Sequence, residues 1–257
     1  MTDGTAPASV PAIDVAAAAR ALEGAAPLEI LRWAAATFPR VALATGFGPE
    51  DCVLIELIAR AGLGIELFTL DTGLLFDETR ALWRTLEARY GVTVRAVTPA
   101  ETVAEQAAAV GDALWAREPD ACCARRKLEP LAAELRRHDA WVTAIRRDQT
   151  RDRADAAVVE VDRRFGLVKV NPLAAWTSAQ VWDHVAAHDV PTNALHAQGY
   201  PSIGCAPCTA PVAAGEDPRA GRWRGRAKDE CGLHARDATP PARLAIVDGR
   251  GAIRRPS

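Results

Sequence analysis

Residues 40–73 read RVALATGFGPEDCVLIELIARAGLGIELFTLDTG, and this stretch decides the fold class. Two apolar runs, 40–45 and 64–71, have the length and composition of buried strands. Between them, residues 50–61 carry apolar side chains at helical spacing. A strand, a helix and a second strand in this order predict a βαβ unit in a parallel sheet.

The alternation continues beyond this unit. The pattern predicts a helix over 75–90, strands over 92–98 and 140–146, and a helix over 178–188 behind the capping box TSAQ. We therefore predict an α/β fold with a parallel twisted sheet and helices on both faces. The expected parts are an N-terminal helical cap (1–39), a nucleotide-binding α/β domain (40–190) and an irregular C-terminal segment (191–257), which holds one cysteine pair and a cysteine-bearing tail.

Composition narrows the class of protein. The chain has 257 residues, of which 49% are hydrophobic and 25% charged, as in ordinary globular proteins. A net charge of -2 provides no general attraction for nucleic acid. The first basic residue is Arg20, and no apolar run is long enough to span a bilayer. We expect neither a secretory signal nor a membrane anchor, and a cytoplasmic location.

Three segments follow predicted strands, where ligands bind in parallel sheets. The first is a glycine turn that opens a helix and offers N–H groups to a phosphate; alone, it also fits a tight turn. The second offers a carboxylate and a hydroxyl to a ribose or base, or caps a helix. The third is arginine-rich and suits phosphate or sulfate, or is a solvated charged loop. The candidate residues are Gly46, Phe47 and Gly48; Asp71, Thr72 and Gly73; and Arg146 and Arg147.

Six cysteines in a cytoplasmic chain indicate metal or thiol chemistry rather than disulfides. Cys122 and Cys123 are adjacent, and Cys205 and Cys208 form a C-x-x-C pair. Four thiolates suit either tetrahedral zinc or a four-iron cluster. Adjacent side chains diverge, so each reaches a separate iron more easily than both reach one zinc ion, which favours the cluster.

Two further features have simpler interpretations. Cys52 lies within an apolar run and is interpreted as a small buried hydrophobe without a functional role. His184 and His188 are one helical turn apart, but no Glu follows His184 and no third ligand is evident. We interpret both histidines as surface residues.

Three stretches with these cysteines resemble the assimilatory sulfonucleotide reductases. They are ACCARRKLEPL (121–131), YPSIGCAPCT (200–209) and KDECGLH (228–234). The resemblance runs from about residue 41 to 234 and includes the three segments that follow strands. It also includes RAGRW (219–223), just before the last cysteine.

The resemblance implies a fold and an activity. The fold is the adenine-nucleotide α-hydrolase-like architecture with a modified phosphate loop. Members with both cysteine pairs carry a [4Fe-4S] cluster and reduce adenosine 5'-phosphosulfate (APS) in assimilatory sulfate reduction. Members specific for the 3'-phosphorylated nucleotide lack these cysteines. An enzyme for that second nucleotide is one alternative; a non-catalytic nucleotide-binding module held by zinc is another.

The resemblance also implies residue roles. Cys231 matches the catalytic cysteine, which attacks the sulfate to give S-sulfocysteine and AMP, and a thioredoxin thiol then releases sulfite. The chain has no room for a fused thioredoxin domain, so the reductant is expected to be a separate protein. Lys127 matches a lysine that links cluster and substrate, and Arg219 and Arg222 are expected to bring positive charge to Cys231. The family suggests a homo-oligomer.

Two positions depart from the family pattern. Gly46 stands where the family commonly has a serine, which removes one hydroxyl contact to phosphate. Asp229 stands where the family often has a threonine, which adds a negative charge two residues from Cys231. The first departure affects affinity rather than reaction type.

Overall fold

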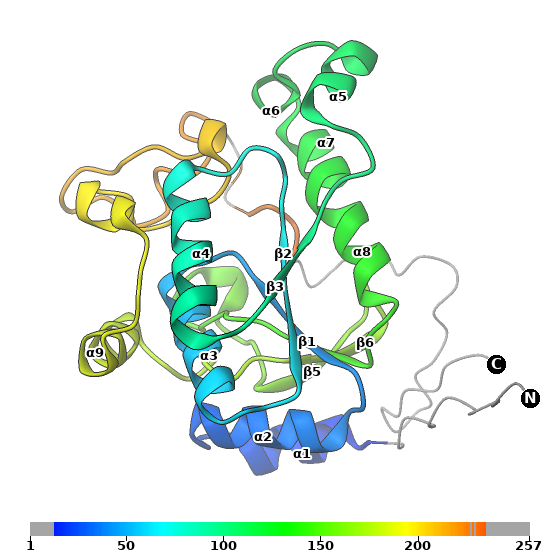
Figure 1. Cartoon of the computed structure of the whole chain (residues 1–257), viewed down its shortest axis with the longest axis vertical. Coiled ribbons are helices and arrows are strands. Elements are labelled where there is room, and N and C mark those ends of the chain that lie inside the picture. Colours follow the sequence, from blue (N-terminus) through cyan, green and yellow to red (C-terminus); the bar gives the residue numbers. More distant parts are fainter. Residues whose placement is uncertain (1–12, 227, 229, 235–257) are drawn as a thin grey trace, which may run out of the picture.

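The computed structural model describes residues 13–226, 228 and 230–234. Its centre is a six-stranded sheet in the order β3-β2-β1-β4-β6-β5 (Figure 1). All pairs from β3 to β6 are parallel, which confirms the predicted parallel sheet; four of these five strands were predicted, and β6 was not. The strands are β1 (Val41–Thr45), β2 (Ile65–Leu70), β3 (Val94–Val97), β4 (Ala140–Val142), β5 (Val159–Asp162) and β6 (Leu167–Val170).

The edge strand β5 was not predicted, and it pairs antiparallel with β6. A tight turn joins the two strands, in which the Asp162 carboxylate accepts the N–H groups of Arg164 and Phe165, both at 3.1 Å. Gly166 completes the turn with a φ of +68°.

Helices surround the sheet. The predicted helices at 50–61, 75–90 and 178–188 are confirmed to within two residues. The helices are α1 (Val15–Leu22), α2 (Pro27–Thr37), α3 (Pro49–Arg60), α4 (Asp77–Tyr90), α5 (Val103–Val110), α6 (Leu114–Arg117), α7 (Pro119–Cys123), α8 (Glu129–Leu135) and α9 (Ser178–His188), with short turns η1 (Ala124–Leu128), η2 (Arg151–Arg153), η3 (Ala194–Gln198) and η4 (Ala206–Cys208).

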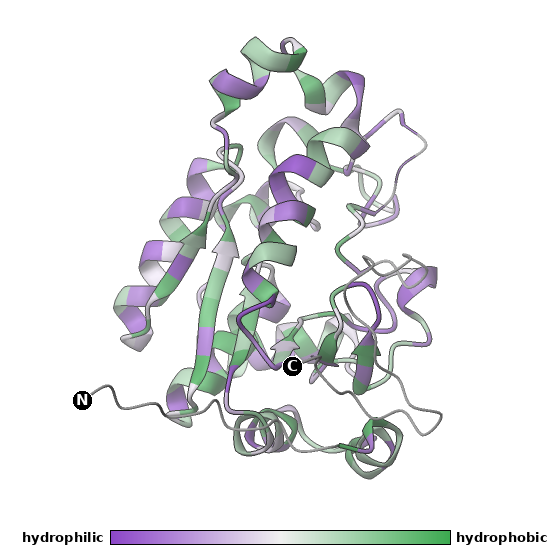
Figure 2. Cartoon of the chain, turned by 90° about the vertical axis from the view of Figure 1, so that its right-hand side faces the viewer, coloured by the Kyte–Doolittle hydropathy of each residue, from purple (hydrophilic) through white to green (hydrophobic). Residues whose placement is uncertain are grey.

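Both faces of the sheet are covered, as predicted. The larger core holds α2, α3, α4 and α9, with fully buried side chains such as Leu31, Leu54 and Leu86. The smaller core lies on the opposite face, where Leu131 and Leu135 of α8 join a second set of apolar residues. Figure 2 shows the strands mostly green between helices that carry purple, hydrophilic positions. Burial on both faces explains the continuous apolar runs in β1 and β2.

Several predicted features fall outside the described residues. These are residues 1–12 of the cap, 235–257 of the C-terminal segment, and Asp229. Within the described part of the chain, no helix combines the length and apolar character needed to cross a membrane. The strand predicted over 140–146 is shorter, since β4 ends at Val142 and the following backbone forms loops.

Candidate active site

The candidate site lies at the carboxyl ends of the parallel strands, where the loops after β1, β2 and β4 meet. The segment 205–234 passes along the same edge and is drawn in orange close to β2 in Figure 1. Cys205 forms a β-bridge with Leu75, and the Ala206 N–H donates to the Leu74 carbonyl at 2.7 Å. The fold therefore brings the C-x-x-C pair to the strand ends.

The glycine turn after β1 uses its backbone donors internally. The N–H groups of Gly46 and Gly48 both donate to Oδ2 of Asp51, at 3.1 and 3.0 Å. The Phe47 N–H donates to the Thr45 hydroxyl at 3.0 Å. The three donors that the sequence offered to a phosphate thus have partners within the chain itself.

Packing holds this loop in its conformation. Phe47 has a φ of +61°, which is uncommon for a residue with a side chain, and its ring stacks on Trp83 with centroids 5.6 Å apart. Asp51 is partly buried, and burial together with the Glu50 carboxylate raises its pKa to about 7. The loop is rigid and carries two acidic groups at the start of α3.

The loop after β2 reaches the cysteines. The Thr72 hydroxyl lies 3.3 Å from Cys205 Sγ, and the Thr72 carbonyl accepts a hydrogen bond from Arg126 Nε at 2.6 Å. Asp71 is held by Arg80 through two hydrogen bonds of 2.9 and 3.0 Å. Its carboxylate also accepts the Gly73 N–H at 3.0 Å. The predicted segment 71–73 therefore belongs to the site, and Asp71 is neutralised there.

The two cysteine pairs face each other across one small cavity. Cys122, Cys123, Cys205 and Cys208 line it together with Lys127. No three of the described cysteine sulfurs lie within 4.8 Å of one another. A tetrahedral zinc ion needs closer sulfurs, since each Zn–S bond is about 2.3 Å, whereas a four-iron cluster spreads its thiolates over four metals. The thiol spacing fits the cluster better than zinc.

Lys127, which is partly buried, lines this cavity and carries a positive charge beside the thiols. Burial raises the pKa of Cys123 to about 11. Burial also acts to raise the pKa of Cys205, but the Lys127 ammonium, the Thr72 hydroxyl and the Arg222 guanidinium together outweigh it and lower that pKa. Burial lowers the pKa of Lys127, and the thiols of Cys205 and Cys231 raise it by more. Lys127 therefore remains charged between the thiols.

A π-helical turn follows the tandem cysteines. The turn η1 runs from Ala124 to Leu128, directly between α7 and α8. Pro130 lies in the first turn of α8 and has no N–H to donate, so the regular hydrogen-bond ladder is interrupted there. The wider turn carries Arg126 and Lys127, which contact the loop after β2 and the cysteines.

The tail that carries Cys231 is held by three contacts. The Glu230 carboxylate pairs with Arg153 at 2.9 Å and with Arg219 at 3.3 Å. The Gly232 carbonyl accepts a hydrogen bond from Arg164 at 2.6 Å. These contacts place Cys231 close enough to act electrostatically on Cys123, Lys127 and Arg219.

Positively charged side chains lie near Cys231, namely Lys127 and Arg219, and Arg219 in turn lies near Arg153 and Arg222. Burial lowers the pKa of Arg219, and the neighbouring Arg153 and Arg222 lower it further against the opposing effect of Glu230. Within the described part of the chain, the buried Nε atoms of Arg153 and Arg222 have no hydrogen-bond partner. Buried donors without partners are costly, so the group suits an anionic ligand.

The two predicted arginines of the arginine-rich loop point to different parts of the molecule. Arg146 is buried and bonds to Glu50 at 3.0 Å and to Asp148 at 2.6 Å. Arg147 points to the N-terminal cap, where it binds Glu23 through hydrogen bonds of 2.7 and 2.8 Å. Of the two predicted residues, only Arg146 lies beside the glycine turn.

Sequence reasoning missed three residues of the site. Arg153 belongs to the arginine-rich loop, but its side chain was not distinguished from the others there. Arg164 lies in the unpredicted hairpin. His234 is partly buried and stacks on Trp141 with centroids 5.8 Å apart, and burial lowers its pKa well below the usual value. Only the position of His234 within KDECGLH could have indicated it.

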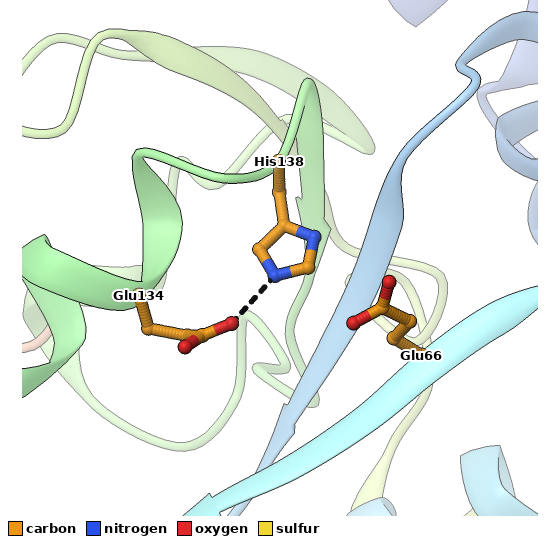
Figure 3. Close-up of side chains that lie close together, drawn as sticks. All are labelled: Glu66, Glu134 and His138. Atoms are coloured by element: carbon orange, nitrogen blue, oxygen red, sulfur yellow. Dashed lines mark hydrogen bonds and ion pairs between the residues drawn. The ribbon is translucent and has the colours of Figure 1, made fainter.

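A second group of ligand-type side chains lies away from the cysteines. Figure 3 shows Glu134 of α8 hydrogen-bonded to His138, with Glu66 of β2 facing them. Arg95 forms two hydrogen bonds with the Glu134 carboxylate and already neutralises it. We interpret this group as a structural ion-pair network.

The predicted surface pair His184 and His188 is only partly exposed. His188 is exposed, but His184 is largely covered and lies 3.1 Å from the buried Glu56 carboxylate. Arg60 pairs with the same carboxylate at 2.7 Å and contacts His188 at 3.1 Å. Both histidines therefore already have partners in the fold, His184 with Glu56 and His188 with Arg60.

Taken together, fold and site define a nucleotide-binding type of α/β protein that groups thiols with buried cations. Residues 40–211 match the phosphoadenosine phosphosulfate reductase domain. The chain belongs to this family. A relative from Mycobacterium tuberculosis named adenosine 5'-phosphosulfate reductase is 46% identical over 230 residues, covering 83% of this chain and 91% of the relative. A relative from Gloeobacter violaceus named phosphoadenosine 5'-phosphosulfate reductase is 47% identical, covering 84% and 92%.

Solved structures support the fold. The crystal structure of phosphoadenylyl-sulfate reductase from Candida auris, in complex with phosphate, matches with a TM-score of 0.69 and 31% identity. It covers 76% of this chain and 96% of that one. Candida glabrata FMN adenylyltransferase in complex with ATP has a TM-score of 0.52 at 16% identity, covering 95% and 81%, and shares the fold alone. The predicted adenine-nucleotide α-hydrolase-like architecture is confirmed.

Proposed function

We propose that this chain reduces APS to sulfite and AMP, with Cys231 as the nucleophile and a separate thioredoxin as the reductant. The observation that carries the proposal is the position of Cys231. The tail sets this thiol beside Lys127 and Arg219, at the carboxyl ends of the strands. A thiol among buried cations is suited to attack an anionic sulfate ester.

The phosphosulfate is proposed to bind the arginines around Cys231. Arg153 and Arg222 have buried Nε donors without partners in the described chain, and Arg219 adds a third guanidinium. Guanidinium groups bind phosphate and sulfate through parallel hydrogen bonds. Lys127 contributes a further positive charge from the side of the cysteines. The nucleotide then completes a group whose positive charge is only partly balanced by Glu230.

The adenosine is proposed to occupy the space between the three loops. Thr72, Gly73 and Arg146 line the strand ends there. The glycine turn contributes shape rather than donors, because its N–H groups are already bonded. Asp71 bonds to Arg80, so it offers a neutralised carboxylate to a ribose hydroxyl. Gly46 has no side chain, so it adds no hydroxyl group to this space.

The reaction has two stages. The Cys231 thiolate attacks the sulfate sulfur, the bond between sulfur and the phosphate oxygen breaks, and AMP leaves with the bonding electron pair. Cys231 then carries an S-sulfonate. A thioredoxin thiolate attacks Cys231 Sγ and releases sulfite, and the second thioredoxin thiol resolves the mixed disulfide. The two electrons that reduce the sulfur come from the thioredoxin dithiol, and Cys231 returns as a thiolate.

The four paired cysteines are proposed to hold a [4Fe-4S] cluster. Their spread of sulfurs and their shared cavity support this assignment over zinc. The cluster would supply structure and negative charge next to Lys127. Lys127, Thr72 and Arg222 together lower the pKa of Cys205. Lys127 thus links the cysteines to the phosphosulfate site.

The proposal is tested by incubating anaerobically purified protein with APS, without reductant, and mapping the modified peptide by mass spectrometry. We expect a sulfonate on Cys231. A parallel incubation uses 3'-phosphoadenosine 5'-phosphosulfate, the nucleotide in the name of the Gloeobacter relative, and tests whether this chain prefers it. Faster sulfonation by this second nucleotide would keep the mechanism and change the substrate. Absence of an adduct from either nucleotide, in protein that retains its metal, would favour a non-catalytic binding module.

A further inference from the structure

The glycine turn after β1 contains its own hydrogen-bond acceptor, the Asp51 carboxyl group. Oδ2 of Asp51 accepts the N–H groups of both Gly46 and Gly48, and the residue is partly buried. A turn of this kind at a helix start binds phosphate when its N–H groups are free. Here a covalently attached carboxylate takes the place of a phosphate oxygen.

The charges around the glycine turn also disfavour a phosphate there. Glu50 is the neighbouring residue, and its carboxylate pairs with Arg146 at 3.0 Å. Arg146 also bonds to Asp148, so its positive charge is already shared between two acids. A polyphosphate entering the turn would meet two carboxylates and donors that are already engaged.

We infer that Asp51 is a specificity-determining residue that fills the phosphate loop and excludes nucleotides carrying a β-phosphate, such as ATP. This inference rests on the proposed function in naming APS as the nucleotide admitted. APS has no β-phosphate, and its phosphosulfate is assigned to Arg153, Arg219 and Arg222. The chain thereby discriminates between ATP and APS. ATP needs free donors and positive charge at the glycine turn, whereas APS needs them at the arginines near Cys231.

Asp51→Ser tests the inference by removing the carboxylate and opening the turn. Calorimetric titration gives the dissociation constants of ATP and AMP without magnesium for each variant. We expect the ratio of the ATP constant to the AMP constant to fall at least about tenfold in Asp51→Ser. The ratio cancels general losses of folding or affinity, so a merely structural role of Asp51 would leave it unchanged.

Two variants serve as matched controls. Asp51→Asn keeps an oxygen on the turn and preserves its shape, so it should retain most of the discrimination. Glu50→Gln removes the neighbouring charge without touching the loop N–H groups. An unchanged ratio in Asp51→Ser, or an equal fall in Glu50→Gln, would overturn the inference.

A second measurement is independent of the proposed function. Inorganic pyrophosphate should raise the melting temperature of Asp51→Ser more than that of the original chain, because a ligand that binds the native state stabilises it. Asp51→Ala serves if Asp51→Ser folds poorly. Equal shifts would contradict a role for Asp51, whatever nucleotide the site takes. Failure of the original chain to bind AMP would instead contradict the proposed function.

Discussion

The Glu230 carboxylate lies 2.9 Å from the guanidinium of Arg153, and this pair connects the C-terminal tail to the loop after β4. The two residues are 77 positions apart in the chain. Because Cys231 follows Glu230 directly, the pair fixes the nucleophile at the strand ends. The same guanidinium has an unpartnered Nε within the described chain, so it can hold the tail and meet an anion.

Arg153→Ala should slow sulfonation of Cys231 by APS on the order of 10²–10³-fold, because it removes a buried donor from the transition-state charge. The rate is followed by mass spectrometry under single-turnover conditions. Arg147→Ala is the matched control from the same loop. Arg147 bonds to Glu23 at the cap, so its loss should change the rate by less than about threefold, as for a residue outside the site. Equal losses in both variants would remove the specific role of Arg153.

Cys231→Ser should abolish the adduct, because a serine hydroxyl is not ionised at neutral pH and is a weak nucleophile. Visible absorption of the protein should stay unchanged, since Cys231 is not one of the four proposed ligands. Cys52→Ala is the control. Cys52 is buried beneath the glycine turn with its sulfur 3.9 Å from the Phe47 carbonyl, so the variant should still form the adduct. An adduct on another cysteine of Cys231→Ser would reassign the nucleophile.

The metal content distinguishes the two interpretations of the cysteine pairs. Anaerobically purified protein should be brown and contain about four iron atoms and four sulfides per chain. Cys205→Ala should lose colour and iron, because Cys205 is the buried thiol beside Lys127. Elemental analysis and the visible spectrum give both results. A colourless protein with about one zinc per chain would contradict the cluster.

Asp51 should make stability depend on pH. Its pKa is raised from 3.8 to about 7 in the folded protein, so the folded state binds more protons than the unfolded state between these values. The free energy of unfolding should therefore fall as pH rises from 4 to 7 and level off above. At about 1.4 kcal/mol per pKa unit, the fall is on the order of 4 kcal/mol.

Asp51→Asn provides the comparison, because it has a similar shape and does not ionise. Urea unfolding at pH 5 and pH 8 should show that the difference in stability between the two proteins changes in favour of Asn at the higher pH. A constant difference would mean that Asp51 titrates alike in the folded and unfolded chain.

The strand and helix pattern could be predicted because it depends on local periodicity. The run 40–73 shows it most clearly, since both strands are buried on two faces and the helix between them has one apolar side. The hairpin β5–β6 could not be predicted in the same way. Its strands are short, and their pairing depends on a turn at Asp162 rather than on a hydrophobic period.

The site shows the same division. The cysteine pairs, Lys127 and Cys231 are marked by short motifs whose chemistry is evident from residue type and spacing. The role of Arg147 depends on the direction in which its side chain points. Arg146 and Arg147 are adjacent and look equivalent in sequence, but Arg146 pairs with Glu50 and Arg147 pairs with Glu23. Sequence spacing contains no information about such directions in a loop.

The sequence by itself therefore determined the α/β class, the set of thiols and the family resemblance, because periodicity and covalent spacing are properties of neighbouring residues. Only the tertiary structure decided that Asp51 fills the glycine turn and that Arg153 and Arg219 hold Glu230. These contacts arise when the chain folds and buries charged groups, since each buried charge must then find a partner from whichever segment lies beside it.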